Sequence, residues 1–202
     1  MSISKLLQDK IASTSQGWVF CANDFSDIGT RVNIDVILHR LAQKKLIRRL
    51  GYGIYDKPIA SNLLGQLSPS IQDIISTYAR KMGQDFVLHP LNAANALGIT
   101  TQVPPKLTYL TDGKSHVISV CGVDIHFIHS SPKIIAGAKS SVGIVIQALR
   151  YFGSKGAPDE ILKILAVRIN RSDLDILNSV KVNALRSIVL QIDRITKIAT
   201  IH

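Results

Sequence analysis

The sequence predicts an α+β protein of two domains, and three observations lead to this prediction. Apolar residues recur at helical spacing near both ends of the chain. Short apolar runs separated by glycine-containing turns lie between these helical regions. A stretch rich in Pro, Ser, Leu and Gly at residues 58–70 divides the chain. We therefore predict a first domain over residues 1–62 and a second, α+β domain with a helical C-terminal part over residues 63–202.

The composition is that of a folded protein with an excess of positive charge. The chain has 24 Lys and Arg against 14 Asp and Glu, a formal net charge of +10, and 46% hydrophobic residues. Such an excess favours a polyanionic partner. Two cysteines, Cys21 and Cys121, lie in apolar runs, and no apolar stretch approaches the length of a membrane helix. We expect reduced thiols and a cytoplasmic protein without a membrane partner.

The first thirty residues predict a helix, a strand and a short second helix. Apolar side chains recur at helical spacing over residues 3–14, and the apolar run 18–22 suits a strand. Asn23 or Asp24 is the expected cap of the short helix. Gly29 is expected to end it at positive φ, which permits a tight turn.

A longer helix is predicted over residues 30–45, with Thr30 as its N-cap. Its buried stripe falls at positions i, i+3, i+4 and i+7, which are Ile34, Ile37, Leu38 and Leu41. The opposite face carries Val32, Asn33, Asp35, Val36, His39, Arg40 and Gln43. This face is therefore expected to meet solvent or a partner.

A basic β-hairpin is predicted directly after this helix, over residues 46–55. Gly51-Tyr-Gly53 supplies its turn, and Arg48, Arg49 and Tyr52 lie at its rim. A short helix, a turn, a longer helix and a basic hairpin follow one another in a winged helix-turn-helix. We therefore predict that residues 1–62 form a winged helix-turn-helix domain that binds DNA.

The charge of this region supports a DNA backbone as the partner. Positions 31–50 hold six Lys or Arg against one acid. Asn33 is a candidate to read adenine, and Arg40 to contact guanine or phosphate. For Arg40 an ion pair with Asp35 or another contact within the fold is an open alternative. The alternative for the whole region is a solvated basic face. The predicted DNA-binding residues are Thr30, Arg31, Asn33, His39, Arg40, Gln43, Lys44, Arg48, Arg49 and Tyr52.

The second part of the chain alternates helices and short strands before it becomes helical. A helix over residues 71–82 is expected to end at Gly83. Further elements are predicted as strands over 86–88, 107–110, 117–121 and 123–128, with turns at Asp112-Gly113 and Gly122, and helices over 90–97, 142–152, 158–169, 173–180 and 183–197.

Sequence motifs for catalysis, metal binding or cofactor binding are missing. His126 and His129 are close in sequence, but three residues apart on a strand they point to opposite faces. Ser115-His116 has no nucleophile-elbow context, and no Gly-x-Gly-x-x-Gly or phosphate-binding loop occurs. We expect a protein that is not an enzyme, with no catalytic residues, no metal and no cofactor.

Two sets of segments resemble those of a known protein family. The first set lies in the N-terminal part and comprises Asp24-Phe25, Thr30-Arg31-Val32, Leu38-His-Arg40-Leu41, Leu46-Ile-Arg-Arg-Leu50 and Gly51-Tyr-Gly-Ile-Tyr55. The second set comprises Asn92-Ala-Ala-Asn95-Ala-Leu-Gly98-Ile-Thr-Thr-Gln102-Val-Pro104, Tyr109-Leu-Thr-Asp-Gly113 and Gln147-Ala-Leu149-Arg-Tyr-Phe-Gly153. Through these segments the chain resembles the AbiEi-type antitoxins of type IV toxin–antitoxin systems over almost its full length.

The resemblance implies an antitoxin that binds its own promoter DNA at inverted repeats and represses the operon. It also implies that the protein counteracts a nucleotidyltransferase-fold toxin without forming a stable complex with it. Two alternatives stay open. One is a winged-helix transcription regulator whose second domain senses a ligand or dimerises. The other is a nucleic-acid-modifying enzyme that uses Asp112 or Asp124 for a metal-dependent step.

Overall fold

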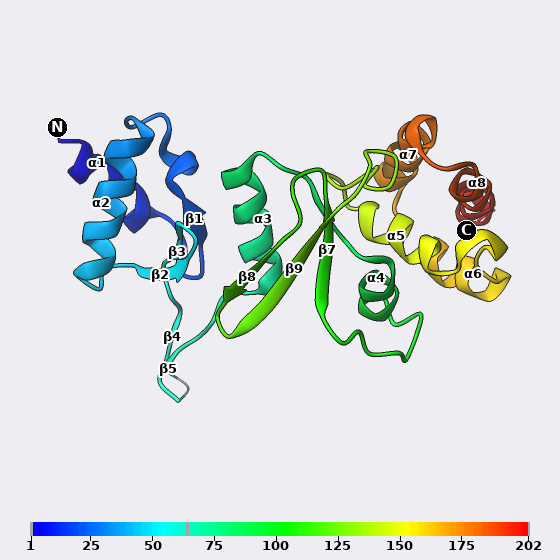
Figure 1. Cartoon of the computed structure of the whole chain (residues 1–202), viewed down its shortest axis with the longest axis horizontal. Helices are drawn as coiled ribbons and strands as arrows, with labels where there is room; N and C mark the ends of the chain where they lie inside the picture. Colours follow the sequence, from blue (N-terminus) through cyan, green and yellow to red (C-terminus); the bar gives the residue numbers. More distant parts are fainter. Residues whose placement is uncertain (1, 64, 202) are drawn as a thin grey trace. The chain divides into compact units, whose positions relative to one another are not determined.

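The computed structural model describes residues 2–63 and 65–201, and it has a mixed α+β architecture, as the sequence predicted (Figure 1). Two compact units are present. The first comprises Met1–Gly83 and Ile118–Val123, and the second comprises Gln84–Val117 and Asp124–His202. The predicted division between residues 62 and 63 stays a prediction, because compact packing alone does not define a domain that folds by itself.

The first unit begins with two helices and a small antiparallel sheet. The three strands have the order β1-β3-β2, and Tyr55 of the middle strand pairs with both Phe20 and Arg49. The elements are α1 (Ile3–Ser13), β1 (Val19–Cys21), the 3₁₀ turn η1 (Ala22–Phe25), α2 (Arg31–Gln43), β2 (Arg48–Gly51) and β3 (Ile54–Asp56). The predicted helix, strand, longer helix and hairpin are thus confirmed as elements.

The core of this unit lies between α1, α2 and the sheet. Leu7, Phe20, Phe25 and Leu38 are fully buried in it. The Phe20 and Phe25 rings meet edge to face, with centroids 5.6 Å apart. Because α2 contributes its apolar stripe to this core, its opposite face is fixed toward the outside of the unit.

The turn of the β2–β3 hairpin requires a left-handed backbone. Gly51 has φ +119°, Tyr52 has φ +50° and Gly53 has φ +69°. Gly51 pairs with Ile54, so Tyr52 and Gly53 form a two-residue loop, and positive φ at both of its residues is the mark of a type I′ turn. Tyr52 occupies a conformation that glycine or asparagine adopts at lower cost.

The segment between β1 and α2 differs from the prediction in two respects. The short helix is a 3₁₀ turn that ends at Phe25, and its N-cap is Cys21, whose N–H donates to Asp24 Oδ2 at 2.9 Å. Gly29 does not have a positive φ, so the prediction that it ends the short helix in a left-handed conformation is wrong. A Cβ at Gly29 would instead lie 3.4 Å from the Ile3 side chain, which indicates a close approach of α1.

Residues 58–70, predicted as a linker, contain a small ribbon. β4 (Ala60–Ser61) pairs with β5 (Gly65–Gln66). The following helix, α3 (Ile71–Met82), ends at Gly83 with φ +64°, as predicted. α3 packs on β1, and the Thr77 hydroxyl donates to the Val19 carbonyl at 3.1 Å, which is why the first compact unit extends to Gly83.

The second unit combines most of a mixed sheet with a helical part. Its strands belong to a sheet of order β6-β7-β9-β8, in which β9 runs parallel to β7. The predicted turn at Asp112-Gly113 therefore does not join neighbouring strands, because β9 lies between β7 and β8. The strands are β6 (Phe86–Leu88), β7 (Leu107–Thr111), β8 (His116–Val120) and β9 (Val123–His129).

Helices form the rest of the second unit and have their own core. α4 packs against α5, and α6 packs against α8 (Figure 1). Leu149, Leu162, Leu177 and Ile192 are fully buried between them. The bounds are α4 (Pro90–Ala96), α5 (Gly143–Tyr151), η2 (Gly153–Lys155), α6 (Asp159–Val167), α7 (Arg171–Val180), η3 (Lys181–Asn183) and α8 (Arg186–Ile201). These helices confirm the predicted helical C-terminal part.

Candidate nucleic-acid interface

The outer face of α2 is exposed where the sequence predicted a reading face. Ile34, Leu38 and Leu41 point into the core and are at most 4% exposed. The predicted contact residues Arg31, Asn33, His39, Arg40 and Gln43 are all exposed. Asn33, His39, Arg40 and Gln43 lie on the face opposite the buried stripe, whereas Arg31, three residues before Ile34, lies at the start of the helix outside this face.

Two valines lie among these polar residues. Val32 is 73% exposed and Val36 is 45% exposed. Exposed apolar side chains on a polar helix face suit contact with thymine methyl groups, which are the apolar feature of the major groove. The face thus combines hydrogen-bonding and apolar groups.

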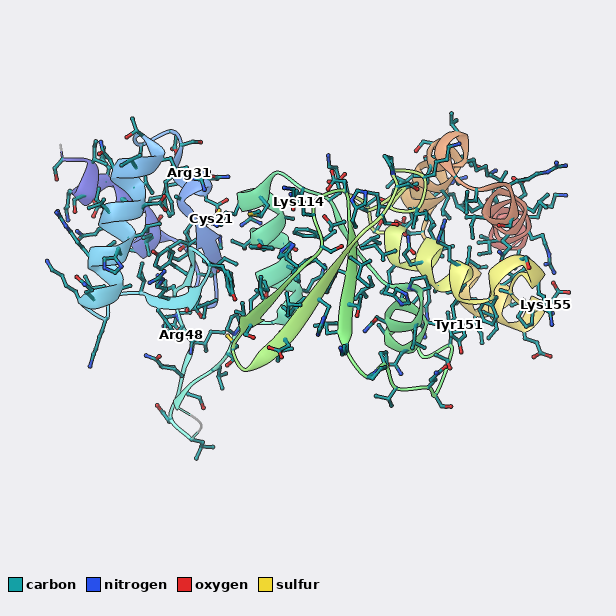
Figure 2. All side chains as sticks on the ribbon, in the orientation of Figure 1. Cys21, Arg31, Arg48, Lys114, Tyr151 and Lys155 are labelled. Carbon is teal, nitrogen blue, oxygen red and sulfur yellow. The ribbon has the colours of Figure 1, made fainter. Side chains whose placement is uncertain are left out.

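The beginning of α2 leaves hydrogen-bonding groups available. Thr30 is the N-cap with an extended backbone, as predicted, but its hydroxyl makes no capping hydrogen bond. The first N–H groups of a helix have no acceptor within the helix, and they attract anions together with the helix dipole. Arg31 lies near the start of α2 (Figure 2), with its Nε 3.9 Å from Asp35 Oδ2 in an exposed pair that is worth little.

The acids of the first 62 residues all form ion pairs, so the cations of this region divide into those with a partner and those without one. Among the described residues, each of the five acids contacts one cation: Asp9 contacts Lys5, Asp24 contacts Arg80, Asp27 contacts Lys10, Asp35 contacts Arg31 and Asp56 contacts Arg48. Lys57 donates instead to three carbonyls at the end of α1, those of Ile11, Ala12 and Thr14. These contacts take up much of the positive charge within the fold.

Four cations of the same region have charged side chains that make no hydrogen bond or ion pair within the described part of the chain. They are Arg40, Lys44, Lys45 and Arg49, here named the 40–49 cluster, and all four are exposed. Arg40 and Lys44 are four residues apart on a helix, where like charges repel. Cations near a helix C-terminus compensate its dipole, but a single one suffices for that purpose. The remaining charge is therefore available to an external anion.

Lys45 was missing from the predicted contact residues, although it belongs to the cluster. The Lys44-Lys45 pair directly after the helical pattern was the available signal. Lys45 has φ +59°, a left-handed conformation that is costly for a side chain with a Cβ, whereas Lys44 has φ −78°. The strained position thus carries a charged residue instead of the glycine that usually ends a helix.

Replacing Lys45 with glycine is expected to raise the free energy of unfolding by up to about 1 kcal/mol, because glycine relieves the left-handed strain. The same change should weaken DNA binding, since it removes one cation of the cluster. Urea unfolding and DNA titration of the variant measure the two effects. Lys44→Gly is the matched control, because it removes the same charge at an unstrained position and should give no gain in stability.

Arg48 differs from its predicted role. Its Nε and Nη2 donate to the two carboxylate oxygens of Asp56 at 3.0 and 2.6 Å, and Nη2 also donates to the Leu67 carbonyl at 2.7 Å. Asp56 is only 1% exposed, and its hydrogen bonds raise the pKa of the Arg48 guanidinium. Figure 2 shows Arg48 beside β2. Because Arg48 is already bound to Asp56 in an ion pair, we leave it out of the proposed DNA contacts.

The tip of the hairpin also has internal contacts. The Tyr52 hydroxyl accepts a hydrogen bond from the Ser119 N–H at 3.3 Å. A Cβ at Gly53 would lie 2.9 Å from Cε of Lys81. The turn thus contacts other parts of the first unit, although Tyr52 is 46% exposed, and Arg49 is the hairpin cation of the predicted set that has no such contact.

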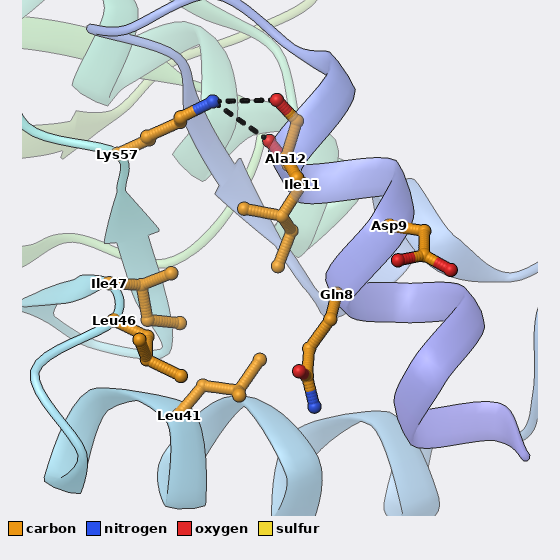
Figure 3. Close-up of a pocket in the computed structure, with 8 residues that line it drawn as sticks. All are labelled: Gln8, Asp9, Ile11, Ala12, Leu41, Leu46, Ile47 and Lys57. Carbon is orange, nitrogen blue, oxygen red and sulfur yellow. Dashed lines mark hydrogen bonds between the residues drawn. The ribbon is translucent and has the colours of Figure 1, made fainter.

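A pocket of about 370 Å³ lies in the first unit between α1, the end of α2 and the chain before β2 (Figure 3). Ile11, Leu41 and Ile47 line much of it, and the ammonium of Lys57 at its edge already donates to the α1 carbonyls. The pocket therefore offers no free cation for an anionic ligand.

The groups considered for other chemistry do not come together. Over residues 2–63 and 65–201, no three His, Cys, Asp or Glu side chains are placed to hold a metal ion. Asp112 accepts a hydrogen bond from the Asp85 N–H at 3.0 Å. His129 Nδ1 lies 2.9 Å from the Gly113 carbonyl oxygen. These side chains have local structural contacts that explain their presence.

Comparisons with known proteins place the chain in a family without giving it a function. No curated protein matches the sequence. In the part of the chain that the structure describes, no helix is long and apolar enough to cross a membrane. A family model described as a family of unknown function, DUF6088, matches residues 6–174. Since the match covers most of the chain, the protein belongs to the DUF6088 family.

Proposed function

We propose that this protein binds duplex DNA through its first unit, with α2 in the major groove. The observation that carries the proposal is the distribution of ion pairs. Every acid of residues 1–62 forms its ion pair with a cation outside the 40–49 cluster, so no carboxylate neutralises this cluster at the end of α2 and the start of β2. In this arrangement Asn33 faces base edges, and Arg40, Lys44, Lys45 and Arg49 contact phosphates.

The order of elements supports the same proposal. A helix, a strand, a short turn of helix, a second helix and an antiparallel hairpin follow one another, and β1 completes the sheet beside β3. This order is that of a winged helix-turn-helix, in which the second helix of the motif reads the groove. The short first helix of the motif corresponds here to η1, a 3₁₀ turn.

The cellular role we propose is that of an autoregulatory antitoxin. The resemblance to AbiEi-type antitoxins supports repression of the protein's own promoter at inverted repeats. It also supports action against a nucleotidyltransferase-fold toxin without a stable complex. Co-expression with the neighbouring gene tests this role: rescue of growth by the full chain supports it, and a neighbour that is harmless when expressed alone contradicts it.

A salt titration tests DNA binding directly. The full chain is titrated with a duplex from its own upstream region between 50 and 200 mM chloride. Four phosphate contacts predict a slope of log K against log salt of about −3 to −4, and roughly a hundredfold loss of affinity over this range. Absence of binding at the lowest salt contradicts the proposal.

Asn33→Ala separates base reading from backbone contact. We expect this change to cost about 1 to 3 kcal/mol of binding free energy at the cognate duplex, because asparagine makes two hydrogen bonds to adenine. Binding to a random duplex should hardly change, and Asn33 is exposed, so folding should be unaffected. An equal loss on both duplexes would show that Asn33 does not read a base.

A further inference from the structure

Arg150 is a cation of the second unit without a counter-charge. It lies in the last turn of α5, and its Nη1 is closed to solvent with no hydrogen-bond partner among the described residues. Burial lowers the pKa of its guanidinium, and no carboxylate opposes this effect. A cation could serve the C-terminal dipole of α5 equally well from an exposed position, so the dipole does not explain its burial. A buried group of this kind indicates a missing partner.

The cavity beside Arg150 combines an apolar lining with a few hydrogen-bond donors. It has a volume of about 460 Å³, within the range of small-molecule sites. Ser130, Ser154 and Ser187 also line it, and their hydroxyls make no hydrogen bond within the described part of the chain. His89 also lines the cavity, and burial lowers its pKa.

The beginning of a long helix reaches the same cavity. Ser187 and Ile188 belong to the first turn of α8, which has 16 residues. The Ile188 N–H already donates to the Leu185 carbonyl at 2.9 Å, so the available N–H groups are those at the very start of the helix, where the dipole is partly positive. Guanidinium, hydroxyls and a helix N-terminus therefore converge on one space from α5, the loop after β9 and α8.

The geometry points to a binding site for a small molecule that carries a phosphate group. The phosphate would accept hydrogen bonds from Arg150, from the serine hydroxyls and from the start of α8. So many donors suit the several oxygens of a phosphate better than the two of a carboxylate. Leu110 and Ile134 offer apolar surface to the rest of the molecule. The inference does not depend on DNA binding.

Inorganic phosphate is the probe for this site. Urea unfolding of the full chain is measured in phosphate, in acetate and in chloride at equal ionic strength and pH. We expect phosphate alone to protect the fold, with the folded-to-unfolded ratio rising about tenfold at a concentration ten times the Kd. Equal protection by acetate overturns the assignment to phosphate, and no protection beyond chloride overturns the site.

Variants locate the effect. Arg150→Met should abolish the phosphate response without loss of stability in chloride, because it removes a half-buried charge that has no carboxylate partner. Ser187→Ala should weaken phosphate binding about tenfold or more. This second variant tests the site even if Arg150→Met fails to fold. Lys155→Met is the control, because Lys155 is exposed and lies outside the cavity (Figure 2). Phosphate should protect this variant as well as it protects the original protein.

The 40–49 cluster also attracts anions, so its contribution must be separated. A variant with Arg40→Gln, Lys44→Gln and Arg49→Gln should keep the full phosphate response if the site lies in the second unit. Loss of the response in this variant, or its survival in both Arg150→Met and Ser187→Ala, overturns the inference. Failure of DNA binding, in contrast, leaves the phosphate response unchanged.

Discussion

Arg48→Met is expected to lower the free energy of unfolding by about 3 to 5 kcal/mol, since it leaves the carboxylate of Asp56 buried without its partner. Asp56 is 1% exposed, and both of its carboxylate oxygens accept hydrogen bonds from Arg48. The pair also joins neighbouring strands, because Arg48 stands opposite Asp56 in the sheet. Urea unfolding of the purified variant gives the change directly.

A double variant shows whether the loss of stability comes from the unpaired charge or from lost packing of the Arg48 side chain. Arg48→Met combined with Asp56→Leu removes both charges, so most of the lost stability should return. Arg49→Met is the control on the same strand, because Arg49 is exposed and unpaired, and its effect should stay within about 0.5 kcal/mol. If the single Arg48 variant were as stable as the Arg49 variant, the ion pair would have no structural importance.

Removing three cations of the 40–49 cluster is expected to have the largest effect on DNA binding. The variant with Arg40→Gln, Lys44→Gln and Arg49→Gln keeps side chains that hydrogen-bond but loses three charges. We expect the slope of log K against log salt to flatten by about 2 to 3 units, because each cation that neutralises a phosphate contributes almost one unit. Affinity at low salt should fall for cognate and random duplexes alike.

The control for this variant has the same net charge. Lys155→Gln, Lys163→Gln and Arg171→Gln remove three exposed cations from the helical part of the second unit. Both triple variants change the net charge from +10 to +7, so a general attraction to DNA predicts the same loss in each. A slope that flattens equally in both would contradict a specific role of the cluster.

Much of the fold could be predicted because its elements have strong local signals. The spacing of Ile34, Leu38 and Leu41 predicted both α2 and its exposed face. Gly83 marked the end of α3, and the Gly51-Tyr-Gly53 turn marked the hairpin. The ribbon of β4 and β5 was missed, because strands of two residues leave no periodic pattern.

The parts that sequence reasoning missed depend on contacts between distant residues. In the sequence, Arg48 and Arg49 are equivalent candidates for DNA contact. Only the register of β2 against β3 shows that Arg48 lies opposite Asp56. The position of β9 between β7 and β8 likewise follows from long-range pairing. The cavity beside Arg150 had no local signal, because its lining residues come from segments that are far apart in the sequence.

The parallel pairing of β7 with β9 determines how this sheet is completed during synthesis. β7 leaves the ribosome before β9, so the edge that β9 will cover stays unpaired while the intervening strand is made. β8 and β9 can close locally as a hairpin, and that hairpin must then dock onto β7 as a whole. Until then Tyr109 lacks the Phe127 ring that stacks on it, and a nascent chain halted soon after Thr111 should depend on chaperones to avoid aggregation.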